Sequence, residues 1–153
     1  MDYAHRWAYH RNPDFYSFDA LGGDCTNFAS QCLYAGSGVM NYTPTFGWYY
    51  NSQYSRAPAW TGVPFFYNFL TRRGESPGPV GEEVSVEEVL PGDFVQLGFG
   101  AEFAHNPVIV ATGSPPAPDN ILVAAHSEDC DYRPLSTYPA RELRFLHILG
   151  ARR

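Results

Sequence analysis

Gly22-Gly23-Asp24-Cys25-Thr26-Asn27-Phe28 opens the stretch that decides the fold, a glycine turn that runs into a helical pattern ending near Gly36. Small and apolar residues recur after the turn at helical spacing: Phe28, Ala29, Cys32, Leu33 and Ala35. We therefore predict a helix in which Asp24 is the N-cap and accepts hydrogen bonds from the amides of the first turn. Cys25 then lies in that first turn.

A cysteine in the first turn of a helix is a candidate nucleophile. The positive end of the helix dipole stabilises a thiolate, and the unpaired backbone N–H groups there can bind an oxyanion. The neighbouring Asp24 carboxylate disfavours the thiolate, so Cys25 requires a histidine partner. The alternative is a buried structural cysteine, a description that fits Cys32 better than Cys25.

Composition limits the class of protein. The 153 residues suit one domain, 1–153, and 44% hydrophobic residues can build a core. The net charge of −6, with no lysine and scattered arginines, argues against nucleic-acid partners. No apolar run predicts membrane insertion, and the first residues of this chain lack the charged and apolar regions of a signal peptide. Three cysteines leave at least one thiol free unless the chain pairs with another.

The second half of the chain predicts strands, at 94–97, from His105 through 108–112, at 121–126 and at 143–149. If the hairpin between the second and third of these pairs symmetrically about its turn, His105 lies opposite His126 on one face. A first histidine could then take the thiol proton while the second orients it. A register slip of one residue would turn the two histidines to opposite faces.

Other segments are less regular. We expect short helices over 3–11 and from Thr61 to about 73, with a surface linker over 75–83. The aromatic stretch after Gly38, which contains Trp48 and Trp60, reads as a loop or lid. Its rings either line a substrate groove, together with Tyr16 and Asp24, or form a small core beneath the loop.

These residues together resemble the putative amidase domain family, a branch of the papain-like peptidases related to the NlpC/P60 and CHAP cell-wall hydrolases. The resemblance rests on Asn12-Pro13, the Gly22 to Gly36 block, the Trp48 to Thr61 region, Pro91-Gly92-Asp93, and His105 with the strands that follow it. The chain departs from the family pattern at Pro107, which removes a ladder hydrogen bond beside the predicted base.

The resemblance implies an α+β, papain-like fold in which the nucleophile helix packs on an antiparallel sheet. It implies Cys25 as nucleophile, His105 as general base and His126 as the third residue, with Asn120 and Asp129 as fallbacks. The expected substrate is a peptide or amide related to peptidoglycan stem peptides, and no metal or cofactor is needed. We expect a monomeric domain of a larger secreted or cell-envelope protein.

Two alternatives remain open at this point. His126 and Cys130 have plausible zinc-ligand spacing, with His105 as a third ligand, although no HExxH or paired CxxC supports a zinc site. The second alternative is a catalytically silent module of the same fold that binds glycan or peptide.

Overall fold

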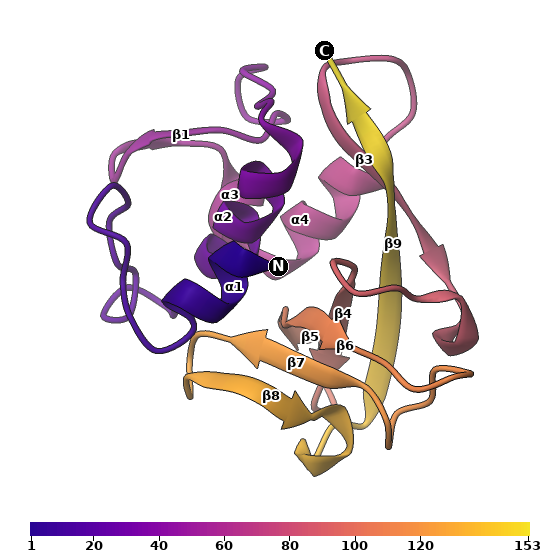
Figure 1. Ribbon diagram of the computed structural model, residues 1–153. Helices are drawn as coiled ribbons and strands as arrows, with labels where there is room; N and C mark the ends of the chain where they lie inside the picture. Colours follow the sequence, from indigo (N-terminus) through magenta and orange to yellow (C-terminus); the bar gives the residue numbers. More distant parts are fainter.

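The computed structural model describes residues 1–153 and has an α+β fold in which helices pack on one side of a curled antiparallel sheet (Figure 1). The α-helices are α1 (Asp2–Trp7), α2 (Cys25–Ser37), α3 (Pro58–Thr61) and α4 (Val63–Leu70). The strands are β1 (Tyr50–Ser52), β2 (Ser55–Arg56), β3 (Gly78–Val84), β4 (Phe94–Gly98), β5 (Phe103–His105), β6 (Val108–Ala111), β7 (Leu122–Ala125), β8 (Cys130–Pro134) and β9 (Glu142–Arg152). Two 3₁₀ helices lie at Val86–Glu88 and Leu135–Thr137.

The main sheet has seven strands in the order β3-β9-β4-β6-β7-β8, with β5 also paired to β4. All its strand pairings are antiparallel. The last strand, β9, therefore lies between β3 and β4, and β1 and β2 form a separate small hairpin.

The strands at the centre of the sheet are buried on both faces. On β4, Phe94 belongs to the core shared with the helices, and Gln96 Nε2 donates to the Val63 carbonyl of α4. The alternate residues Val95 and Leu97 belong to a second core that includes Tyr138. Side chains alternate between the two faces along a strand. Even-numbered residues of β4 therefore face the helices, and odd-numbered residues face the opposite side of the sheet.

The predicted nucleophile helix is present as α2. It starts at Cys25, with Asp24 at the N-cap, and buries Phe28 and Leu33 against the helix-facing core. Its end was predicted two residues early, because Gly38 and not Gly36 adopts the left-handed conformation (φ 68°) and donates its N–H to Tyr34 O at 2.8 Å. A left-handed C-cap favours glycine because glycine has no Cβ to clash there.

Three other segment predictions are corrected. The predicted linker over 75–83 contains most of β3, which pairs with β9 from Gly78↔Arg152 to Val84↔Phe145. The helix predicted from Thr61 to about 73 is present as the shorter α4, which starts at Val63 because Gly62 is extended (φ −116°, ψ 128°) and separates it from α3. The first helix is also shorter than predicted and ends at Trp7.

The aromatic segment contributes to the main core. Trp48 and Trp60 are fully buried, and their ring centroids lie 4.7 Å apart. Their indole N–H groups donate to Ser30 Oγ at 3.0 Å and to Asn27 Oδ1 at 2.9 Å, both on α2. The prediction that these two tryptophans contact substrate is therefore wrong for this conformation, since their surfaces are used to hold the segment on α2.

None of the helices has both the length and the apolar character needed to cross a bilayer.

Candidate functional site

Cys25 is the first residue of α2, as predicted. Its sulfur makes one side-chain hydrogen bond, at 3.8 Å to Thr26 Oγ1. Burial raises the pKa of the Cys25 thiol. The Thr26 hydroxyl and the backbone N–H groups of Asn106 and Thr26 have the opposite effect, because they face the sulfur and favour the thiolate. The Asp24 charge raises the pKa further. In this conformation the thiol is half-buried and its surroundings favour the protonated form.

Asp24 contacts several segments around the start of the helix. Its side chain was predicted to cap the helix, but it makes no capping hydrogen bond. Its Oδ1 accepts from the backbone N–H of Phe18 at 2.8 Å and from Asn27 Nδ2 at 2.9 Å. Its Oδ2 pairs with His126 Nδ1 at 2.6 Å and lies 3.7 Å from Arg11 Nε. The carboxyl group is fully buried and makes these contacts in place of hydrogen bonds to the backbone N–H groups of the first turn.

His126 is held at both ring nitrogens. Nδ1 faces Asp24 Oδ2 and Nε2 lies 2.7 Å from the Trp7 carbonyl oxygen, while the ring stacks on Phe28 at 4.0 Å. Each ring nitrogen thus faces an oxygen atom at hydrogen-bond distance. No nitrogen of His126 is left to receive the Cys25 proton.

His105 lies on the opposite side of the sheet from α2. It pairs with Leu97, whose side chain belongs to the second core, and its ring lies 5.4 Å from the Tyr138 ring. Burial, with a smaller contribution from Arg133, lowers the pKa of His105 to about 4. The ring is therefore neutral near pH 7, and it makes no hydrogen bond within the protein.

The predicted pairing of His105 with His126 is wrong by one residue. Strand β6 pairs with β7 through Val108↔Ala124 and Ile109↔Val123. Counted back two residues, this register places Asn106 across from His126, on the helix-facing side that Val108 shares. The structure therefore brings Asn106, and not His105, to Cys25.

Asn106 was missed by the sequence reasoning. It is 1% exposed, and neither Nδ2 nor Oδ1 has a hydrogen-bond partner. A buried amide without partners is uncommon and costly, so this position is under local strain. The signal that could have found it is the alternation of Val108 and Val110, which points back to Asn106 as the residue on the helix-facing side.

The remaining predicted site residues have other partners. Tyr16 is partly exposed near the helix start, and its carbonyl accepts from Asn27 Nδ2. Asn120 closes the β6–β7 turn through Oδ1, which accepts from two backbone N–H groups. Asp129 pairs with Arg11 at 2.9 Å. Neither fallback residue is bonded to the Cys25 sulfur.

The three zinc ligands considered from the sequence do not converge. His126 is bonded to Asp24 on the helix-facing side. Cys130 and His105 both lie around Tyr138 on the other side, where Cys130 Sγ is 3.4 Å from the Tyr138 hydroxyl. No group of three or more His, Cys, Asp or Glu side chains is arranged to hold a metal ion.

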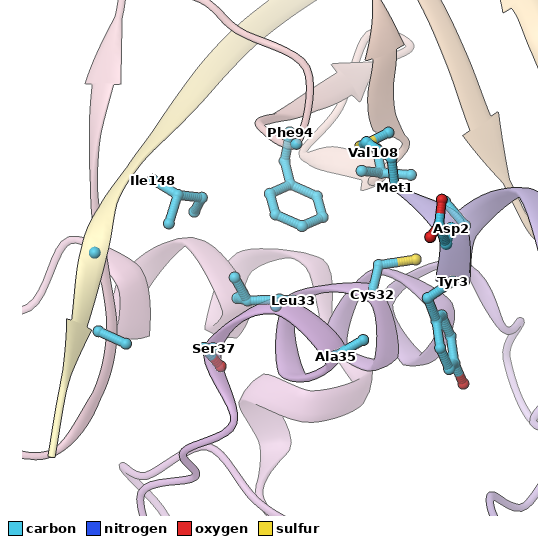
Figure 2. A pocket seen from close by; sticks show the side chains of 15 residues that line it. Met1, Asp2, Tyr3, Cys32, Leu33, Ala35, Ser37, Phe94, Val108 and Ile148 are labelled. Atoms are coloured by element: carbon cyan, nitrogen blue, oxygen red, sulfur yellow. The ribbon is translucent and has the colours of Figure 1, made fainter.

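A cavity of about 650 Å³ lies beneath α2, but Cys25 is not part of its lining. Figure 2 shows Cys32 and Leu33 on the helix facing Phe94, Val108 and Ile148 of the sheet across this space. Its lining is mostly apolar, and burial raises the pKa of the Cys32 thiol. These apolar surroundings fit the interpretation of Cys32 as a structural cysteine.

Comparison with known protein families gives a match that covers almost the whole chain. Residues 1–149 match the family model described as "Putative amidase domain". The chain belongs to this family. A relative of this putative amidase domain is "Uncharacterized protein YhbB" of Bacillus subtilis (strain 168), with 30% identity over 159 residues that cover 97% of this chain and 49% of that protein. The amidase domain thus spans about half the length of this relative, and no solved structure matches it.

Proposed function

We propose that this putative amidase domain is a cysteine-dependent hydrolase of amide bonds, with Cys25 as the nucleophile. The observation that carries the proposal is the position of the Cys25 sulfur at the start of α2, with backbone N–H groups of Thr26 and Asn106 facing it. Such N–H groups favour a thiolate and can bind the oxyanion formed from an amide carbonyl. We assign the domain to the papain-like group that includes the NlpC/P60 and CHAP hydrolases.

The reaction has two halves. The Cys25 thiolate attacks the amide carbonyl, the carbon–nitrogen bond breaks, and the amine leaves with a proton supplied by an imidazolium. Water then hydrolyses the thioester to a carboxylic acid and restores the thiol. No metal takes part in these steps.

His105 is the base that we assign to this reaction. Its ring is neutral and unbonded, as a proton acceptor must be, whereas both nitrogens of His126 are occupied. His126 acts as a positioning residue that ties Asp24, and with it the start of α2, to the carbonyl of Trp7. Because His105 faces away from the sulfur in this register, the assignment requires a local rearrangement of β5.

We propose peptidoglycan stem peptides or related peptides as the substrate class, in keeping with a domain of a secreted or cell-envelope protein. Tyr16, which is partly exposed beside the helix start, is the residue that we propose contacts the substrate.

One observation favours a second candidate function, a catalytically silent module that binds peptide or glycan. No imidazole lies within hydrogen-bond distance of the Cys25 sulfur, and burial raises the pKa of that thiol. A module of this kind would retain its ligand without cleaving it.

The two functions are separated by incubating the protein with purified peptidoglycan and with synthetic stem-peptide amides, and measuring released amines. For a hydrolase, Cys25→Ser lowers the rate by about a thousandfold or more, whereas the matched change Cys32→Ser leaves it unchanged. Binding of these substrates without amine release, equal in the wild-type protein and Cys25→Ser, would favour the silent module.

A further inference from the structure

The pairing of β5 with β4 contains one extra residue. Gly98 pairs with Phe103 and Leu97 pairs with His105, so Ala104 has no partner on β4. This arrangement is a β-bulge, which bends the strand and sets the faces of the residues beyond it. The bulge at Ala104 is therefore what turns His105 away from α2 and Asn106 toward it.

The pairing is fixed on both sides of this segment. Gly98↔Phe103 lies before it, and the Val95 N–H donates to Pro107 O at 3.1 Å after it. Between these points β4 offers two residues, Gln96 and Leu97, while the facing chain has three. Any one of the three can be the unpaired residue without a change in the pairing on either side.

Asn106 is poorly accommodated in the present register. It is 1% exposed and has no hydrogen-bond partner for either side-chain atom, whereas His105 is 8% exposed and makes no hydrogen bond within the protein. If Asn106 became the unpaired residue, Ala104 would pair with Leu97 and His105 would pair with Gln96. His105 would then occupy the place of Asn106 on the helix-facing side, across from His126.

We propose that this bulge moves between Ala104 and Asn106, and that the movement switches the site between a resting register and an active register in which His105 lies beside Cys25. This inference rests on the proposed function, whose regulation it describes. In the active register the imidazole takes the proton of the thiol, which gives a thiolate and an imidazolium. In the resting register the thiol keeps its proton.

The charged surroundings of His105 differ between the two registers. On the opposite side of the sheet it faces Arg133 of β8 and Tyr138, and the guanidinium disfavours an imidazolium. On the helix-facing side the charged and titratable groups are Cys25, Asp24 and its partners Arg11 and His126. A thiolate at Cys25 would favour the imidazolium there, so the proton transfer and the register change support each other.

Two single-residue deletions separate the registers. Deletion of Ala104 removes the extra residue and fixes His105 in the resting position, whereas deletion of Asn106 fixes His105 beside Cys25. The probe is iodoacetamide, with the modification of Cys25 followed by mass spectrometry from pH 5 to 9 and with Cys32 and Cys130 as internal references. We expect Cys25 to react about tenfold or more faster at pH 6 to 7 in the Asn106 deletion than in the Ala104 deletion.

Adding His105→Gln to the Asn106 deletion should abolish this difference. Equal Cys25 reactivity in two folded deletion variants would overturn the inference. A reactive Cys25 in the Asn106 deletion that releases no amine from any stem peptide would instead count against the proposed function and leave the register change intact.

A second measurement uses the full-length chain without a deletion, in case the shortened strand does not fold. In a Cys32→Ser, Cys130→Ser background, His105→Cys places a thiol that reaches Cys25 only in the active register. Slow formation of a disulfide under mild oxidation supports the switch. The matched variant Asn106→Cys reports the resting register, and crosslinking through Asn106→Cys alone, with none through His105→Cys, would overturn the switch.

Discussion

The Asp24 carboxylate lies 2.6 Å from Nδ1 of His126, and both side chains are about 1% exposed. This pair joins the start of α2 to the end of β7, two segments that are 102 residues apart in the sequence. Because His126 also donates to the Trp7 carbonyl, the same ring connects α1 to the site. The start of the nucleophile helix is thus held by a buried contact between a carboxyl group and a histidine.

Removing one partner of this pair should destabilise the protein strongly. We expect Asp24→Asn to lower the free energy of unfolding by about 3 kcal/mol, since the buried His126 ring loses its carboxyl partner and the surrounding hydrogen bonds are disrupted. Urea titration followed by circular dichroism measures the change. The matched change Asp19→Asn removes a partly exposed partner of Arg11 and should cost about 1 kcal/mol or less. Equal losses in the two variants would contradict the buried-pair description.

His105 should make the folded state sensitive to acid. The pKa of His105 is about 4 in the folded protein, whereas a histidine in the unfolded chain has a pKa of about 6.5. The unfolded chain therefore binds the proton more tightly. The free energy of unfolding is therefore highest above about pH 6.5. It falls by about 3 kcal/mol in total as the pH drops toward 4. Unfolding curves of the wild type and His105→Gln at pH 7.5, 6, 5 and 4 test this. Parallel pH profiles would show that His105 is not the group responsible.

The end of α2 distinguishes two glycines. Gly36 lies inside the helix with open space where a Cβ would project, so Gly36→Ala should stabilise the protein by about 0.5 to 1 kcal/mol. Gly38 has a φ of 68°, so Gly38→Ala should destabilise it by about 1 kcal/mol. Thermal melts of both variants give the signs. We expect the melting temperature to rise for Gly36→Ala and to fall for Gly38→Ala. A fall for Gly36→Ala and a rise for Gly38→Ala would instead place the C-cap at Gly36.

Asn27 satisfies the buried indole of Trp60. Asn27→Ala leaves the Trp60 N–H without its acceptor and frees the Tyr16 carbonyl, so we expect a loss of about 2 to 3 kcal/mol. Asn51→Ala is the matched control, because Asn51 is exposed and makes one long hydrogen bond, at 3.3 Å to Ser55 Oγ. Near-ultraviolet circular dichroism should change only in Asn27→Ala. A loss no larger than that of the control would exclude a structural role for this bond.

The parts of the fold that the sequence predicted well are those with a strong local pattern. The start of α2 at Cys25 and the strand at Phe94 follow from periodicity and from the glycine turns that precede them. Strand β3 was missed because Gly78, Pro79 and Gly81 read as a turn, whereas pairing with β9 decides its conformation. Local propensity cannot report a partner strand that lies more than 60 residues away in the chain.

The position of Cys25 at the start of a helix was predicted correctly, whereas the faces of the strand residues were predicted only in part. Helical spacing fixes Cys25 without reference to the rest of the chain. The face of His105 depends instead on where one extra residue lies in β5, and that choice is made by pairing with β4. Likewise, aromatic composition could not show that Trp48 and Trp60 are buried, because their placement depends on acceptors supplied by α2.

Because β9 lies between β3 and β4, the main sheet cannot form completely until β9 has been synthesised. Both neighbours emerge well before β9, and at about 5 to 20 residues per second the gap lasts several seconds. During that interval β3 and β4 lack a shared neighbour, so the nascent chain exposes edges that favour aggregation. We expect chaperones to protect the polypeptide at these two segments until residues 142–152 close the sheet.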